Sequence, residues 1–131
     1  MVAYTVHGGG RFEELGSYAR GRRVGDHVFV AGTTAIEPSG RLHAPDNTYS
    51  QTLFVLRRID EVLQQMGAEL ADVVRTMAYL TDMTTAGDFV RAHGEIFRGI
   101  AEPVSTAVGA VLTTPGMMVE IEVQAIVQSR P

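Results

Sequence analysis

The sharpest alternation of apolar and polar positions lies near the end of the chain. Residues 118–128 form a predicted strand, because every second side chain there is apolar. Successive side chains of a strand point to opposite faces. One face carries Val119, Ile121, Val123, Ala125 and Val127. The other carries Glu120, Glu122 and Gln124. We expect the apolar face to pack in the core and the carboxylates to lie on an accessible face.

Five further segments are predicted to be strands from their β-branched and aromatic content: residues 2–6, 18–24, 27–35, 73–81 and 105–112. Gly25-Asp26 suits a tight hairpin turn. Residues 8–10, three glycines, are taken as a flexible connection, since no lysine follows as in a phosphate-binding loop. In the strand 105–112 we assign the core side to Thr106, Val108, Ala110 and Leu112.

Two segments have the apolar period of a helix. In residues 48–66 the apolar positions are Leu53, Leu56, Ile59, Leu63 and Met66. Thr48 and Gln51 have the spacing of a capping box at its start, and Gly67 is placed to end it. A second helix is predicted at residues 85–97, where Phe89, Ala92, His93 and Ile96 share one stripe.

The predicted order is β-β-β-α-β-α-β-β, an α+β fold with a six-stranded mixed sheet in one domain of residues 1–131. Strand–helix–strand passages cross over one face of a sheet, so both helices should lie on the same side. The opposite face then has no internal cover. A mixed small and polar face of this kind is typical of an oligomer interface that encloses clefts.

Composition narrows the possible functions. The chain has 131 residues, 45% of them hydrophobic, and a formal net charge of −4, which argues against an extended nucleic-acid surface. No cysteine is present, so disulfides and thiolate catalysis are excluded. The four histidines lie far apart, which argues against a metal site. The sequence shows no membrane-length apolar run and no secretory signal, so we expect a cytoplasmic protein.

Residues 102–108 (Glu-Pro-Val-Ser-Thr-Ala-Val) and 119–123 (Val-Glu-Ile-Glu-Val) resemble the closing motif of the Rid family, also called YjgF or L-PSP proteins. The resemblance extends to Gly16-Ser17-Tyr18, to residues 28–33 and to residues 72–83. This chain differs from the family at one important position. Where the family carries an arginine that binds the carboxylate of a reactive imino acid, this chain has Ser105.

The resemblance implies a homotrimer with a ligand cleft between each pair of neighbouring subunits, and no cofactor. Carried over, the cleft residues are Tyr18, Gly32, Thr33, His93, Ser105, Thr106, Ala107 and Glu120, with the backbone contributing at Gly32 and Thr33. Arg20 lies two positions after Tyr18, so on an extended strand both side chains share a face. Arg20 could therefore restore the guanidinium in the cleft. The alternative is an exposed strand arginine.

Family activity is the hydrolysis of 2-imino acids, or their enamine tautomers, to 2-keto acids and ammonia. Glu120 is the expected catalytic residue, which would position water and carry its proton. Glu122 is expected to be structural. Ser105 cannot replace a charge-assisted contact of roughly 1.5–3 kcal/mol, so carboxylate binding would weaken about 10- to 150-fold.

Three functions stay open from the sequence. The first is an imine or enamine hydrolase with altered substrate choice. The second is a non-catalytic trimer that binds a small metabolite in the same clefts. The third is an L-PSP-type ribonuclease, which the acidic charge and unpaired histidines disfavour.

Overall fold

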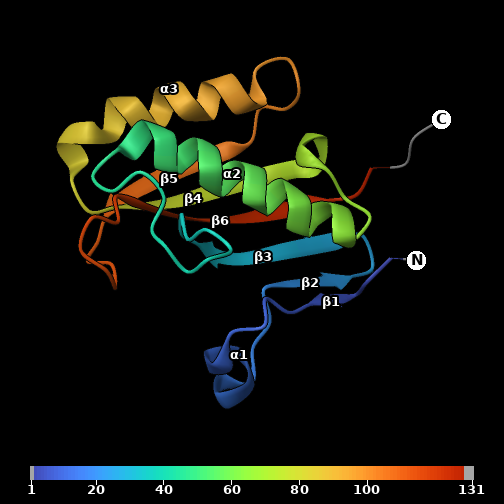
Figure 1. Cartoon of the computed structure of the whole chain (residues 1–131). Helices are drawn as coiled ribbons and strands as arrows, with labels where there is room; N and C mark the ends of the chain where they lie inside the picture. The colour runs from blue at the N-terminus through green and yellow to red at the C-terminus, as the bar shows by residue number, and fades with distance from the viewer. Residues whose placement is uncertain (1, 129–131) are drawn as a thin grey trace.

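The computed structural model describes residues 2–128, and these form a mixed six-stranded sheet (Figure 1). Its strands are β1 (Thr5–Val6), β2 (Gly21–Val24), β3 (His27–Thr33), β4 (Val73–Leu80), β5 (Val104–Gly109) and β6 (Val119–Ile126). Their order across the sheet is β1-β2-β3-β6-β4-β5. Only β4 and β5 pair in parallel, and the other neighbours are antiparallel. The predicted mixed sheet is confirmed.

The two long helices cover one face of the sheet, as predicted (Figure 1). They are α2 (Thr48–Gln65) and α3 (Ala86–Phe97). Two short 3₁₀ turns, η1 (Leu70–Asp72) and η2 (Met83–Thr85), precede β4 and α3. A third helix, α1 (Arg11–Gly16), stands away from this layer on an arm between β1 and β2. The other face of the sheet is therefore not covered by α2 or α3.

The core lies between α2 and the sheet. Leu56, Ile59, Leu63 and Met66 are fully buried, and so are Val119, Ile121 and Ala125 of β6, with Val123 nearly so. Burying side chains of this size stabilises a fold by roughly 1.5–3 kcal/mol each. The apolar face predicted for the last strand is confirmed through residue 125, whereas Val127 lies beyond β6 and is only partly buried.

Several strands are shorter than predicted. The first is limited to Thr5–Val6, and the second begins at Gly21 instead of residue 18. The third ends at Thr33, β5 ends at Gly109, and β6 covers Val119–Ile126. No element was predicted at residues 11–16, where α1 forms. This helix has only six residues, too few for an apolar period to become visible.

The predicted capping box of α2 is wrong. Asn47 is the N-cap, and its side chain accepts a hydrogen bond from the Ser50 backbone N–H. The Thr48 hydroxyl instead bonds to that of Thr85 at 2.8 Å, which connects α2 to η2. The buried Gln51 side chain bonds to backbone groups of two loops. Both side chains thus connect α2 to other segments, a role that the three-residue spacing could not reveal.

The core side assigned to β5 is also wrong. Ser105 pairs in register with Thr76 and Ala107 with Ala78, and both β4 residues are fully buried under the helices. The positions facing the helices are therefore Ser105, Ala107 and Gly109. Thr106 and Val108 face the uncovered side and are exposed. Apolar content alone assigned the wrong face, because the layer above Ser105 is polar and contains the Thr76 hydroxyl and the His93 ring.

Candidate ligand-binding site

Glu120 lies against the backbone of a β-bulge on the neighbouring strand. Val30 pairs with Val123 and Thr33 with Ile121, so β3 has one more residue than β6 in this interval. Gly32 belongs to this bulge. A Cβ atom on Gly32 would be 2.7 Å from Oε1 of Glu120, so only glycine leaves room for the carboxylate there. Glu120 is half-buried and makes no hydrogen bond or ion pair within residues 2–128.

Arg20 fixes the same bulge from the other side. Its Nη2 donates to the Gly32 carbonyl at 2.9 Å, and its Nε is buried with no partner among the described residues. Tyr18 and Arg20 precede β2 rather than lying on a strand, yet they line one cavity. The shared cavity fits the predicted proximity of the two side chains, while the predicted role of Arg20 in ligand binding stays a prediction.

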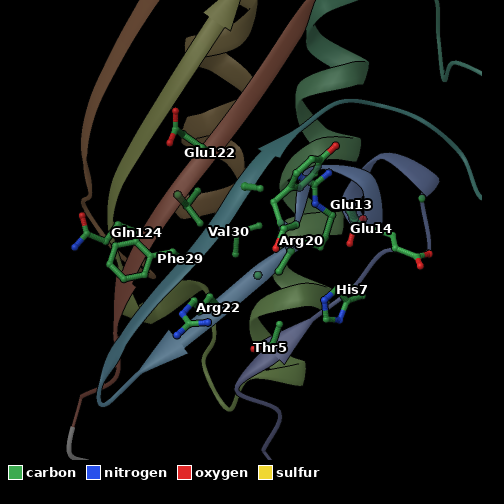
Figure 2. A pocket seen from close by; sticks show the side chains of 18 of the residues that line it. Thr5, His7, Glu13, Glu14, Arg20, Arg22, Phe29, Val30, Glu122 and Gln124 are labelled. Atoms are coloured by element: carbon green, nitrogen blue, oxygen red, sulfur yellow. The ribbon is translucent and has the colours of Figure 1, made fainter.

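This first cavity has a volume of about 1380 Å³ and lies between the uncovered face of the sheet and the α1 arm (Figure 2). The sheet contributes Arg22, Phe29 and Glu122, and the arm contributes His7 and Glu13. Both carboxylate oxygens of Glu13 accept from the Gly8 N–H, at 3.0 and 3.1 Å. The arm is thereby folded into a wall of the cavity.

The side chains of Thr33 and Glu122 have structural partners. Thr33 is buried, and its hydroxyl donates to the Ala31 carbonyl at 2.8 Å, so its side chain is not available to a ligand. Glu122 accepts a hydrogen bond of 2.5 Å from the Tyr79 hydroxyl. That bond raises the pKa of Tyr79 above its ordinary value. These contacts agree with a structural role for Glu122.

Ser105 and His93 belong to a second cluster, on the helix side of the sheet. The Thr76 hydroxyl donates to Oγ of Ser105 at 2.8 Å and lies 2.9 Å from Nε2 of His93. A hydroxyl has a single proton to donate, so His93 must donate from Nε2. The ring of His93 lies between those of Phe89 and Phe97. Burial lowers the pKa of His93, which favours the neutral imidazole.

A second cavity, of about 580 Å³, opens beside His93 at the end of α3. Its polar or charged lining side chains are His93, Arg98 and Glu102, and Phe97 and Pro103 add apolar walls. Arg98 was not among the site residues predicted from the sequence. The available signal was a cation directly after the last turn of the predicted second helix. Ala107 packs partly against the core, and Thr106 lies on the opposite face.

The two clusters cannot meet within one subunit. Glu120 pairs with Tyr79, whereas Ser105 pairs with Thr76, three positions further back on β4. Ser105 is therefore displaced from Glu120 by two strands, and by three residues along them, which is roughly 10 Å in each direction. The two side chains also point to opposite faces of the sheet. A small ligand can contact both only if two subunits contribute to one cleft.

Residues 2–128, which the structure describes, contain neither a metal-binding cluster nor a membrane-spanning helix. No group of three or more histidine, aspartate or glutamate side chains is placed to hold a metal ion within that range. None of the helices formed by these residues is long and apolar enough to span a bilayer.

Comparison with known proteins identifies the family. The profile of the endoribonuclease L-PSP family matches residues 9–127, which is nearly the whole chain. The chain belongs to the Rid/YjgF/L-PSP family. A RutC family protein of Pyrococcus abyssi is 30% identical over 108 residues, covering 82% of this chain and 84% of the relative. The resemblance noted in the sequence is confirmed.

A crystal structure of a YjgF/YER057c/UK114 family member from Mycobacterium tuberculosis is 40% identical to this Rid-family chain. It superposes with a TM-score of 0.82 and covers 94% of this chain and 98% of its own. The mouse 2-iminobutanoate/2-iminopropanoate deaminase is 25% identical over 86% of this chain and 82% of the relative. Imine deamination therefore occurs among distant relatives.

Proposed function

We propose that this protein hydrolyses small reactive imines or enamines to a carbonyl compound and ammonia. The observation that carries the proposal is the Glu120 carboxylate, which is half-buried against the Gly32 bulge and has no hydrogen-bond or ion-pair partner within residues 2–128. A carboxylate held in this way can accept a proton from a water molecule and return it later. The deaminase activity of the mouse relative supports the same chemistry.

The reaction needs one water and one proton carrier. The imine nitrogen first takes a proton from solvent, and Glu120 would then accept a proton as the water oxygen attacks the C=N carbon, which gives a neutral carbinolamine. The nitrogen then takes up a proton, the C–N bond breaks, and the hydroxyl proton leaves as the C=O bond forms. Ammonia and the carbonyl product account for all the atoms. The water must lie within hydrogen-bond reach of Glu120 and close to the imine carbon.

The active unit in this proposal is a homotrimer. Glu120 with the Gly32 backbone and Tyr18 would come from one subunit, and Ser105 with His93 from its neighbour. The uncovered sheet face supports an assembled state, because it exposes Phe29 (44%) and Val108 (38%), which a neighbouring sheet would cover. Family resemblance implies the same arrangement.

Position 105 should contact a substrate differently from the strand arginine of other family members. Ser105 is neutral, and its hydroxyl already accepts a hydrogen bond from Thr76. It can therefore give a ligand a single hydroxyl hydrogen bond, where an arginine would give two parallel ones. Ser105 by itself therefore does not select imines that carry a carboxylate.

The test measures ammonia and carbonyl release from freshly generated imines, with and without a carboxylate, for the wild type and two variants. Glu120→Gln should lower the rate about 100-fold or more, as loss of a general base does. Glu122→Gln is the matched control, since it lies on the same face of β6 and can still accept from Tyr79. Wild-type rates no higher than those in buffer, or equal rates for Glu120→Gln and wild type, would refute the proposal.

A second candidate is a trimer that binds a metabolite without converting it. The exposed Ser105 hydroxyl favours it, because it offers a neutral polar contact without a catalytic charge. A metabolite that raises the melting temperature and is recovered unchanged would support binding alone.

A further inference from the structure

The cavity beside His93 is lined by Arg98, which carries the positive charge that Ser105 lacks. Arg98 follows α3 directly, and its backbone N–H donates to the Gly94 carbonyl at 2.9 Å. The side chain then turns back along the last turn of the helix. A Cβ atom on Gly94 would be 3.0 Å from Nη2 of Arg98, so the guanidinium lies directly over that glycine. Glycine at position 94 thus makes the space that the guanidinium occupies.

This position brings Arg98 beside His93 in one cavity. The Thr76 hydroxyl bridges His93 and Ser105, since it contacts both side chains. Arg98 therefore lines a cavity whose His93 wall is connected, through Thr76, to the position where the family has its arginine. It reaches that cavity from the end of a helix instead of from β5. Within residues 2–128 Arg98 forms no ion pair, so its side-chain donors remain available.

We propose that Arg98 binds the carboxylate of the ligand and makes 2-imino acids the preferred substrates. This inference rests on the proposed function and specifies its substrate class. A guanidinium recognises a carboxylate through two parallel hydrogen bonds, which a serine cannot provide.

Glu102 refines the ligand class further. Glu102 lines the same cavity, and its negative charge would repel a simple anion. A ligand with a carboxylate and a protonated nitrogen offsets that repulsion, because the nitrogen can face Glu102. The protonated form of a 2-imino acid carries both groups on adjacent carbons. The cavity is therefore suited to a small zwitterion.

The experiment compares two substrates in four proteins. One substrate is a 2-imino acid generated in situ from a small amino acid, and the other is an imine of similar size without a carboxylate. The proteins are the wild type, Arg98→Ala, Arg98→Lys and Arg91→Ala. Arg91 is the matched control on α3, because it pairs with Asp88 and stacks over Tyr49, outside the cavity.

Arg98→Ala should lower kcat/KM for the 2-imino acid about 10- to 150-fold, mainly through KM, and leave the uncharged imine unchanged. Arg98→Lys should recover part of the loss, and Arg91→Ala should behave as wild type. An unchanged substrate preference in Arg98→Ala, or an equal loss on both substrates, would overturn the role of Arg98 while the hydrolase proposal stands.

Failure of the hydrolase proposal has a different signature, namely no turnover of either substrate by the wild type. Arg98 is then tested by calorimetric binding of a zwitterionic amino acid and its amide. Preference for the free acid that disappears in Arg98→Ala supports the role of Arg98 in carboxylate binding. Equal binding of the acid by both proteins overturns it.

Discussion

At Gly32 the missing side chain determines where the Glu120 carboxylate can lie. We predict that Gly32→Ala will fold but lose most of its imine hydrolysis, because the new Cβ would be 2.7 Å from Oε1 and 3.0 Å from Cδ of Glu120. The carboxylate is the flexible end of its side chain, so it should move and leave the backbone intact. Turnover and the melting temperature should be measured together.

The control for this substitution is Gly87→Ala on α3, where a Cβ would meet no atom within 4 Å. That variant should keep its full activity and gain slightly in stability, since alanine favours a helix by up to about 1 kcal/mol over glycine. If Gly32→Ala remained fully active, the contact with Gly32 would not control the position of Glu120.

His93 predicts a pH dependence of stability. Burial lowers its pKa below the ordinary value of 6.5. Between the lowered and the ordinary pKa, the unfolded chain binds more protons than the folded protein, so the free energy of unfolding rises with pH. The contribution of His93 is complete above the ordinary pKa and is lost as the pH falls through the folded-state value.

His93→Gln should therefore show a smaller decrease in stability than the wild type when urea unfolding is compared between pH 8 and pH 5. Glutamine can still donate to the Thr76 hydroxyl, so the fold is retained. His27→Gln, at an exposed position of β3, serves as the control and should leave the profile unchanged. Identical profiles for wild type and His93→Gln would show that the imidazole stays accessible to protons.

At the scale of elements, the bulge between β3 and β6 depends on Arg20. Removing this side chain in Arg20→Leu leaves the half-buried Gly32 carbonyl without its donor. We predict a loss of about 1–3 kcal/mol in the free energy of unfolding, the usual cost of deleting one partner of a charged hydrogen bond. Arg22→Leu, two residues along and exposed, should change stability far less. Unchanged stability with weakened ligand binding would instead support the capture of ligand by Arg20.

An element could be predicted from the sequence when the side chains packed against it are all of one kind, apolar or polar. The apolar half of β6 lies under α2 and has one kind of neighbour, so simple alternation predicted it correctly. The edge strand β5 has the Thr76 hydroxyl and the His93 ring on its helix side, so Ser105 belongs there and Val108 does not. Side-chain polarity alone gives the wrong face when the covering layer is itself polar.

The candidate site was predictable only as a set of residue types. The family motif selected Glu120, Gly32, Ser105 and His93, but no sequence pattern indicated that they form two groups on opposite faces of the sheet. Arg98 was missed for a related reason. Its position depends on the space over Gly94, and a spatial relation of this kind has no signature in the order of residues.

For the whole molecule, the separation of the two groups is the decisive feature. One subunit presents Glu120 on its uncovered face and Ser105 on its helix side, roughly 10 Å apart in each in-plane direction. If both groups contact one ligand, each cleft must combine one group from each of two neighbouring subunits. A change in either group should inactivate a pure oligomer, and the defects should complement each other in a mixed one.

The most direct test mixes two inactive variants. Glu120→Gln removes the proton carrier, and Ser105→Trp fills the space beside His93. The two proteins are unfolded, combined in equal amounts and refolded together, and hydrolysis of an imine is measured against each variant refolded alone. If neighbouring subunits share each cleft, about a quarter of the clefts receive both intact groups by random assembly, and a similar fraction of the wild-type rate returns. If mixed oligomers form but stay as inactive as the separate variants, the clefts are not shared between subunits.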